Sequence, residues 1–329
     1  MIFKLLSFVA ISVAIYFAIA FGLILSQRPS TAVAADQGLD FQRILGDGFA
    51  LPVDEAAVVR SEVELRDGSA LELLTLRRGD APDLPILLMV HGSGWHGAQF
   101  ERLGWALADL AEVRIVTLRG HGATPDRRGD VDYLGQFEDD LADVLKDAGD
   151  REVLVLGHSS GGGLVVRMAG GAHGGLIDRA ILLAPFLQHD APTTRANSGG
   201  WAKPLTRRII GLSMLNMVGV HAFDHLTAIQ FNMPKAVLDG PMGHTATTAY
   251  SWRLNQSFAP RRDWQGDVGK LPEFLLIVGA RDEAFDAALF EPTLKEITTK
   301  GQYEIVPDVG HLDVVNAPET LAMIREFLR

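Results

Sequence analysis

A serine flanked by glycines lies near the middle of the chain, between two apolar stretches. Residues 157–161 read GHSSG and fit the pattern G-x-S-x-G, with VLVL before them and LVVRMA shortly after them. A sharp turn from a strand into a helix holds the central hydroxyl at the edge of a sheet, and the glycines leave room for close backbone approach. The sequence therefore predicts that Ser159 is a nucleophile, and the spacing gives Ser160 a backbone donor role.

A hydroxyl is a poor nucleophile at its own pKa, so Ser159 needs a base. His311 follows a strand-like stretch and a short loop, just before the last predicted helix. Asp282 lies in the segment 279–283, which directly follows the apolar stretch 274–278. A carboxylate there can accept the imidazole N–H and fix its tautomer. The order serine, acid, histidine matches this kind of site. We therefore predict His311 as general base and Asp282 as acid. Glu283 and Asp286 are the competing acids nearby.

A glycine-rich loop at residues 91–97 follows another apolar stretch. Such a loop can direct a backbone N–H at the negatively charged oxygen that forms during acyl transfer, together with the N–H of Ser160. We predict that Ser93 supplies this donor, with Gly94 and Trp95 as alternatives.

Three further side chains are expected to line the substrate pocket, namely Trp95, His96 and His158. For Trp95 and His96, ordinary packing within the loop is the competing interpretation. His158 lies in a glycine-rich turn, where a hydrogen bond to the backbone would also explain it.

The composition excludes several other classes of protein. The chain has 41 acidic and 30 basic side chains, a net charge of -11, whereas phosphate binding needs a basic surface. It has no cysteine and no H-E-x-x-H motif. No G-x-G-x-x-G follows the first strand-like stretch, 58–65, and no Walker A sequence is present. We therefore expect no nucleic-acid partner, no metal and no cofactor.

The elements that position these residues follow from the pattern of apolar stretches. Two strand-like stretches, 58–65 and 71–76, are joined by a turn signal. Five short, continuously apolar stretches then alternate with helical ones, as in a parallel sheet buried on both faces. These stretches are 85–90, 113–118, 153–156, 180–184 and 274–278. The alternation predicts a mostly parallel, doubly wound α/β sheet, with its core at 55–185 and 270–329.

The alternation is interrupted at residues 186–269, which contain helix-like pieces rich in Trp, Met and Phe. An insertion of this length is too long for a plain loop. Since ligands of open α/β sheets bind at the carboxyl edge of the strands, we predict a helical lid over that edge that contacts substrate. A small helical core of its own is the alternative.

The N-terminal segment, residues 1–28, contains no charge between residues 5 and 25. About 21 helical residues span roughly 30 Å, the thickness of a bilayer's hydrocarbon core, whereas the apolar region of a signal peptide usually has about 7–15 residues. We predict a retained membrane anchor followed by a tether at 29–54. A signal cleaved at the small-residue pattern 32–34, or a buried helix, is the alternative.

The charges beside this segment predict its orientation. Lys4 and the terminal amine precede it and Arg28 follows it. This slight bias favours a cytoplasmic N-terminus with the catalytic domain on the extracytoplasmic side of the membrane. If the segment were cleaved, the protein would be secreted or periplasmic.

Together these motifs resemble the α/β-hydrolase superfamily, and within it the group of lysophospholipases, monoacylglycerol lipases and serine aminopeptidases. The matching pieces are HGSGWHG at 91–97, RGHG at 119–122, GHSSGG at 157–162, GARDE at 279–283 and VGHLD at 309–313. They stand in the family's order over residues 68–328. The resemblance implies the α/β-hydrolase fold and a serine–aspartate–histidine triad.

From these observations we expect a hydrolase that cleaves carboxylic esters of lipid-like substrates, such as lysophospholipids or monoacylglycerols, through an acyl-enzyme. The apolar insertion and the neighbouring membrane segment favour an acyl chain. A serine aminopeptidase or amidase is the first alternative, and it needs an acidic anchor such as Asp224 or Asp239 in the insertion. A hydrolase fold without catalytic activity, serving as a binding module, is the second.

Overall fold

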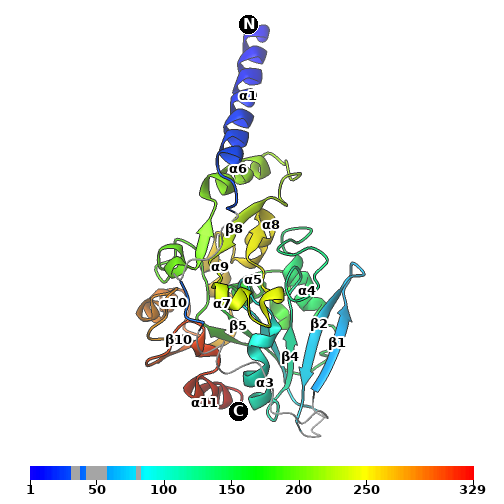
Figure 1. Ribbon diagram of the computed structural model, residues 1–329, viewed down its shortest axis with the longest axis vertical. Coiled ribbons are helices and arrows are strands. Elements are labelled where there is room, and N and C mark those ends of the chain that lie inside the picture. The colour runs from blue at the N-terminus through cyan, green and yellow to red at the C-terminus, as the bar shows by residue number, and fades with distance from the viewer. Residues whose placement is uncertain (31–37, 42–57, 79–82) are drawn as a thin grey trace.

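The computed structural model describes residues 1–30, 38–41, 58–78 and 83–329 (Figure 1). Its main sheet has eight strands in the order β1-β2-β4-β3-β5-β6-β10-β11. β1 and β2 form an antiparallel hairpin, β2 is antiparallel to β4, and the remaining neighbours are parallel. The strands are β1 (Val58–Glu64), β2 (Ala70–Leu76), β3 (Ile86–Val90), β4 (Glu112–Val116), β5 (Val153–His158), β6 (Arg179–Leu183), β10 (Glu273–Gly279) and β11 (Gly301–Val306).

The five continuously apolar stretches of the sequence form the central strands β3, β4, β5, β6 and β10. Every residue of β3 and of β5 is buried. A strand buried on both faces cannot alternate apolar and polar residues, which is why these segments read as unbroken apolar runs. The predicted α/β sheet is confirmed.

Helices cover this sheet in two groups. The first helices along the core are α3 (Glu101–Leu107), α4 (Gln136–Val144) and α5 (Ser160–Gly170). The later ones are α8 (Trp252–Phe258), α9 (Trp264–Gly269), α10 (Phe290–Lys295) and α11 (Pro318–Phe327). α3 contacts α11, whereas α5 contacts α4, α8 and α9. The last part of the predicted insertion therefore packs on the core and not over the sheet edge.

The strand order places a crevice between the carboxyl ends of β3 and β5. The chain continues from β3 to its neighbour β4 on one side, and from β5 to its neighbour β6 on the other. The connections thus leave in opposite directions, and ligands of open α/β sheets bind at such a point. The loop at 91–97 follows β3, and Ser159 follows β5.

Residues 186–251, which we call the cap, are not purely helical as the sequence had indicated. They contain α6 (Thr206–Met217) and α7 (Lys235–Leu238), but also a three-stranded antiparallel sheet. Its strands are β7 (Ala202–Pro204), β8 (Thr227–Phe231) and β9 (Ala249–Ser251). Two of them have only three residues, which is too short for a periodic pattern to be recognised.

The N-terminal segment is one helix, α1 (Ile2–Ser26), which projects away from the rest of the molecule (Figure 1). It is long and apolar enough to cross a membrane. Its last turns pack against α6, where a β-carbon on Gly211 would lie 2.5 Å from the carbonyl oxygen of Ala20. The Tyr16 hydroxyl donates a hydrogen bond to the carbonyl oxygen of Met214. The small-residue pattern at 32–34 and most of the predicted tether lie outside the described residues.

Candidate active site

Ser159 lies at a strained turn between β5 and α5. Its φ and ψ are 55° and -121°, a conformation that side-chain-bearing residues rarely adopt. A β-carbon on Gly157 would lie 2.4 Å from the carbonyl oxygen of Gly161, and one on Gly161 would lie 2.2 Å from that of Val90. Both positions therefore require glycine, which explains the G-x-S-x-G pattern. The turn holds the hydroxyl above the carboxyl ends of the strands.

The three residues predicted as a triad come together from the ends of β5, β10 and β11. His311 Nε2 lies 3.0 Å from Ser159 Oγ, and His311 Nδ1 lies 2.8 Å from Asp282 Oδ2. Because a carboxylate only accepts, Nδ1 carries the proton and Nε2 accepts from the hydroxyl. All three residues are buried, with 8%, 3% and 1% of Ser159, Asp282 and His311 exposed. This geometry suits removal of the hydroxyl proton by the imidazole.

Asp282 is held as an acceptor on both oxygens. Its Oδ1 accepts hydrogen bonds from the backbone N–H groups of Ala284 and Phe285, at 2.8 and 2.7 Å. Its other oxygen faces His311. Of the competing acids, Asp286 caps the short helix that follows it, accepting from the Ala288 N–H.

Glu283 supports His311 in a way that the sequence did not reveal. Its Oε2 accepts a hydrogen bond of 2.8 Å from the backbone N–H of His311. On the other side, His158 Nε2 donates to the His311 carbonyl oxygen at 2.9 Å, and Gln99 Nε2 donates to His158 Nδ1 at 3.3 Å. Burial and the neighbouring His311 lower the pKa of His158 to about 3, so its ring is neutral. Both its nitrogens are engaged in holding His311.

The loop after β3 presents one candidate oxyanion donor and excludes another. Within the described part of the chain, the backbone N–H groups of Ser93 and Ser160 donate no hydrogen bond. The N–H of Gly94, in contrast, donates to the Tyr250 hydroxyl at 2.6 Å. Gly94 is therefore not available to an oxyanion. The Ser93 hydroxyl accepts from the indole N–H of Trp201 at 3.0 Å, which anchors the loop to the cap.

Tyr250 connects the cap to this loop. His121 Nδ1 lies 2.9 Å from the Arg119 carbonyl oxygen and must donate to it, so His121 Nε2 accepts from the Tyr250 hydroxyl at 2.6 Å. Burial raises the pKa of Tyr250 and lowers that of His121 to about 4, which keeps both groups neutral. No pattern in the sequence predicts these hydrogen bonds of Tyr250.

The cavity beside the triad is small. Its volume is about 20 Å³, and Ser159, Ser93, His158 and His311 form its polar side. The apolar lining comprises Leu39, Phe41, Trp95, Trp201 and Leu312. Trp95 and His158, both predicted to line the substrate pocket, thus border this cavity.

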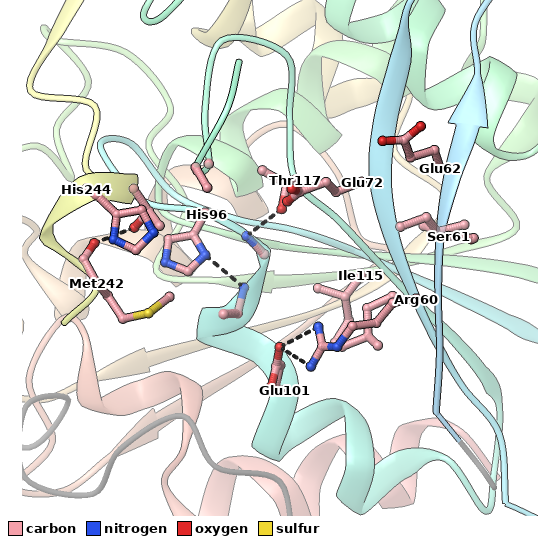
Figure 2. A pocket seen from close by; sticks show the side chains of 17 residues that line it. Arg60, Ser61, Glu62, Glu72, His96, Glu101, Ile115, Thr117, Met242 and His244 are labelled. Atoms are coloured by element: carbon pink, nitrogen blue, oxygen red, sulfur yellow. Dashed lines mark hydrogen bonds and ion pairs between the residues drawn. The ribbon is translucent and has the colours of Figure 1, made fainter. Parts of the chain in front are cut away.

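A much larger cavity, of about 590 Å³, lies between β2, β4 and the turn after the glycine-rich loop (Figure 2). It is lined by His96, Glu72 and His244 among others, and Ser159 is not part of it. His96, predicted to line the substrate pocket, therefore lines this larger cavity and not the one beside the triad. His96 instead caps a short helix, since its Nδ1 accepts from the Ala98 N–H.

Comparison with known proteins agrees with this fold. Three solved structures are similar over nearly their full lengths. A membrane phospholipase A, described as a bacterial virulence factor, is 17% identical, with 99% of this chain and 97% of that chain covered and a TM-score of 0.56. A thermophilic esterase from Thermogutta terrifontis (21%; 82% and 98% covered; TM-score 0.56) and a putative aryl esterase from Burkholderia cenocepacia (20%; 82% and 98%; 0.58) are also similar.

Among curated proteins, none matches the sequence. At these identities the structural likeness establishes the fold alone. The model of the alpha/beta hydrolase family, however, matches residues 87–324, which include the serine turn and both of its partners. The chain therefore belongs to the alpha/beta hydrolase family.

Proposed function

We propose that the protein is a serine hydrolase that cleaves carboxylic esters with an apolar acyl chain. The observation that carries this proposal is the hydrogen-bonded series from Ser159 Oγ through His311 to Asp282, at 3.0 and 2.8 Å, on a strained strand–helix turn. The carboxylate fixes the tautomer in which His311 Nε2 accepts the hydroxyl proton.

The reaction would proceed in two steps. Ser159 Oγ attacks the ester carbonyl carbon while His311 Nε2 takes its proton, and the backbone N–H groups of Ser93 and Ser160 stabilise the resulting oxyanion. The C–O bond to the alcohol then breaks, and His311 returns the proton to the leaving alkoxide. Water attacks the acyl-enzyme with His311 again as base, which releases the carboxylic acid and restores Ser159.

The lining of the small cavity supports an apolar acyl group. Besides the polar residues Ser159, His311, Ser93, Gln99 and His158, its walls are mainly aromatic and aliphatic. The two carboxylates considered as anchors for a peptide's amine do not line it. Asp224 is buried and accepts from Asn216 Nδ2, and Asp239 pairs with Lys235. Ester hydrolysis is therefore favoured over the aminopeptidase alternative.

The membrane location belongs to the same proposal. We infer that α1 anchors the protein in the membrane, because most of α1 is exposed and apolar. We also infer, from the charges beside the segment, that the hydrolase domain lies on the extracytoplasmic side. The similarity to a membrane phospholipase A makes lysophospholipids and monoacylglycerols the first substrates to test. Intact mass of the protein from its native membrane would distinguish a retained anchor, with the full mass, from a cleaved signal.

A substrate comparison tests the function. The full chain in detergent would be assayed on p-nitrophenyl esters from acetate to palmitate and on aminoacyl p-nitroanilides. We expect turnover of the esters, loss of this turnover in Ser159→Ala, and retention in Ser61→Ala, which removes an exposed hydroxyl on β1. Preferential cleavage of the anilides would contradict the ester proposal.

A further inference from the structure

Residues 38–41, far from the triad in the sequence, lie directly against it. Only 9% of Leu39 and 6% of Phe41 are exposed, and both line the cavity that contains Ser159 and His311. The Phe41 ring lies 5.8 Å from the rings of Trp95 and Trp201. Two apolar side chains from the segment after α1 are thus part of the site.

The remaining space does not admit an ester. A cavity of about 20 Å³ holds roughly one water molecule, whereas small-molecule pockets usually measure roughly 300–1,000 Å³. A substrate carbonyl can reach Ser159 Oγ only when part of the lining moves.

Leu39 and Phe41 differ from Trp201 in the contacts that hold them in the lining. Trp201 donates its indole N–H to Ser93, and its backbone bonds to Ser198 and Asn232. The backbones of Leu39 and Phe41, in contrast, make no hydrogen bond within the described residues. These two residues are held in the site by apolar contacts of their side chains, which another apolar group can replace.

We propose that Leu39 and Phe41 occupy the acyl-binding site and that the acyl chain of a substrate displaces them. The inference rests on the proposed ester hydrolysis. Displacement removes the apolar contacts of two side chains, so only an acyl chain with enough apolar surface compensates for it. A buried methylene is worth about fourfold in binding. Displacement of Leu39 and Phe41 therefore lowers kcat/KM by the same factor for every ester, and each buried methylene of the acyl chain raises it again.

A chain-length series measures both effects. In the full-length protein, kcat/KM should rise with acyl length from butyrate to dodecanoate. The double variant Leu39→Ala/Phe41→Ala should raise kcat/KM about tenfold for every ester, as expected if the displaced state is populated roughly one part in ten, while the increase of kcat/KM with acyl length remains. Leu134→Ala/Leu176→Ala, which truncates two exposed side chains, should keep the wild-type series.

If Leu39 and Phe41 were instead fixed walls of the acyl site, the double variant would lower kcat/KM, most for the long esters. That result, or kcat/KM values equal to those of the wild type for every ester, would overturn the proposal. Thermal unfolding of the variant shows whether a loss reflects misfolding.

A second experiment observes the displacement itself and remains informative if the double variant misfolds. Since the chain has no cysteine, Phe41→Cys introduces a single thiol. Its rate of reaction with a maleimide should be low in the free protein and should rise severalfold after a dodecyl fluorophosphonate has modified Ser159. A methyl fluorophosphonate should raise it much less.

The outcomes separate this inference from the function on which it rests. Absence of any adduct on Ser159 would contradict the proposed hydrolase. An adduct with a dodecyl chain that leaves the thiol equally protected would contradict only the displacement of Phe41.

Discussion

Tyr250→Phe removes one hydroxyl that joins the cap to the glycine-rich loop at residues 91–97. In the wild type this oxygen accepts from the Gly94 N–H and donates to His121 Nε2, both at 2.6 Å. The Gly94 carbonyl oxygen also accepts from the Thr247 N–H, so both polar backbone groups of Gly94 bond to the cap. The substitution keeps the ring and breaks one of these two connections.

The size of the effect follows from burial. Tyr250 is 2% exposed, so the variant leaves the Gly94 N–H and the His121 ring nitrogen unsatisfied in the interior. Each such group costs about 1–3 kcal/mol, and we expect the free energy of unfolding to fall by about 2–4 kcal/mol. The N–H of Ser93, one residue before Gly94, loses its fixed direction. Since loss of a complete oxyanion donor costs about 10²–10³ in kcat, partial misalignment should lower kcat about tenfold with a smaller change in KM.

The assay is urea unfolding together with kcat and KM on a single ester. Tyr133→Phe is the matched control, because its hydroxyl donates to Asp139 at 2.7 Å on the exposed surface, and it should change kcat little. The reasoning is refuted if Tyr250→Phe unfolds at the wild-type urea concentration, or if it is destabilised and kcat nonetheless stays at the wild-type value.

Three further predictions concern the triad, the anchor and pH. Asp282→Asn should keep the fold but lower kcat by roughly 10³–10⁴, because the amide stabilises the wrong tautomer of the catalytic imidazole; steady-state kinetics measures this, and a loss below tenfold would be inconsistent with the proposed role. Gly211→Leu should separate α1 from α6, since a β-carbon there lies 2.5 Å from a carbonyl oxygen, and should destabilise the protein by about 1–3 kcal/mol in thermal unfolding; an unchanged Tm would contradict the packing. Burial lowers the pKa of His158 to about 3 and that of His121 to about 4, whereas both are about 6.5 in the unfolded chain. At pH values between the folded and the unfolded pKa, the unfolded state therefore binds more protons than the folded state. Stability from these groups is complete above about pH 6.5 and should fall toward pH 4, by up to about 1.4 kcal/mol per pH unit for each histidine; urea unfolding at pH 7, 6 and 5 checks this, and equal stability throughout would argue against neutral buried rings.

The fold could be predicted because the strands of a parallel sheet covered on both faces can be recognised from the sequence alone. Strands such as β3 and β5 are buried along their whole length, so they stand out as short apolar runs between helices. The strands of the cap have no comparable sequence pattern, because β7 and β9 have three residues each. Their pairing depends on contacts that no local pattern encodes.

The candidate triad could be predicted because each member lies in the short segment after the carboxyl end of a strand. The structure brings Ser159, Asp282 and His311 within hydrogen-bonding distance, while their catalytic roles stay predictions. Glu283 accepts from the backbone N–H of His311, and Gln99 donates to the ring of His158. Both partners are distant in the sequence, and no spacing marks these supporting residues.

The pocket was the least predictable part of the site. His96 lies in the glycine-rich loop at residues 91–97 but lines a different cavity from the one beside the triad. Leu39 and Phe41, more than a hundred residues before Ser159, face the triad. Closeness in the sequence therefore did not predict which residues line the cavity beside the triad. Leu39 and Phe41 reach it because the segment after α1 brings their side chains back to the sheet edge.

The central claim is that His311 activates the Ser159 hydroxyl. It is tested most directly by incubating the full-length protein with an alkyl fluorophosphonate and mapping the adduct by mass spectrometry. The account predicts one adduct, on the peptide that contains Ser159, absent in Ser159→Ala and formed far more slowly in His311→Gln. Labelling that persists in Ser159→Ala, or that proceeds at the wild-type rate in His311→Gln, would contradict it.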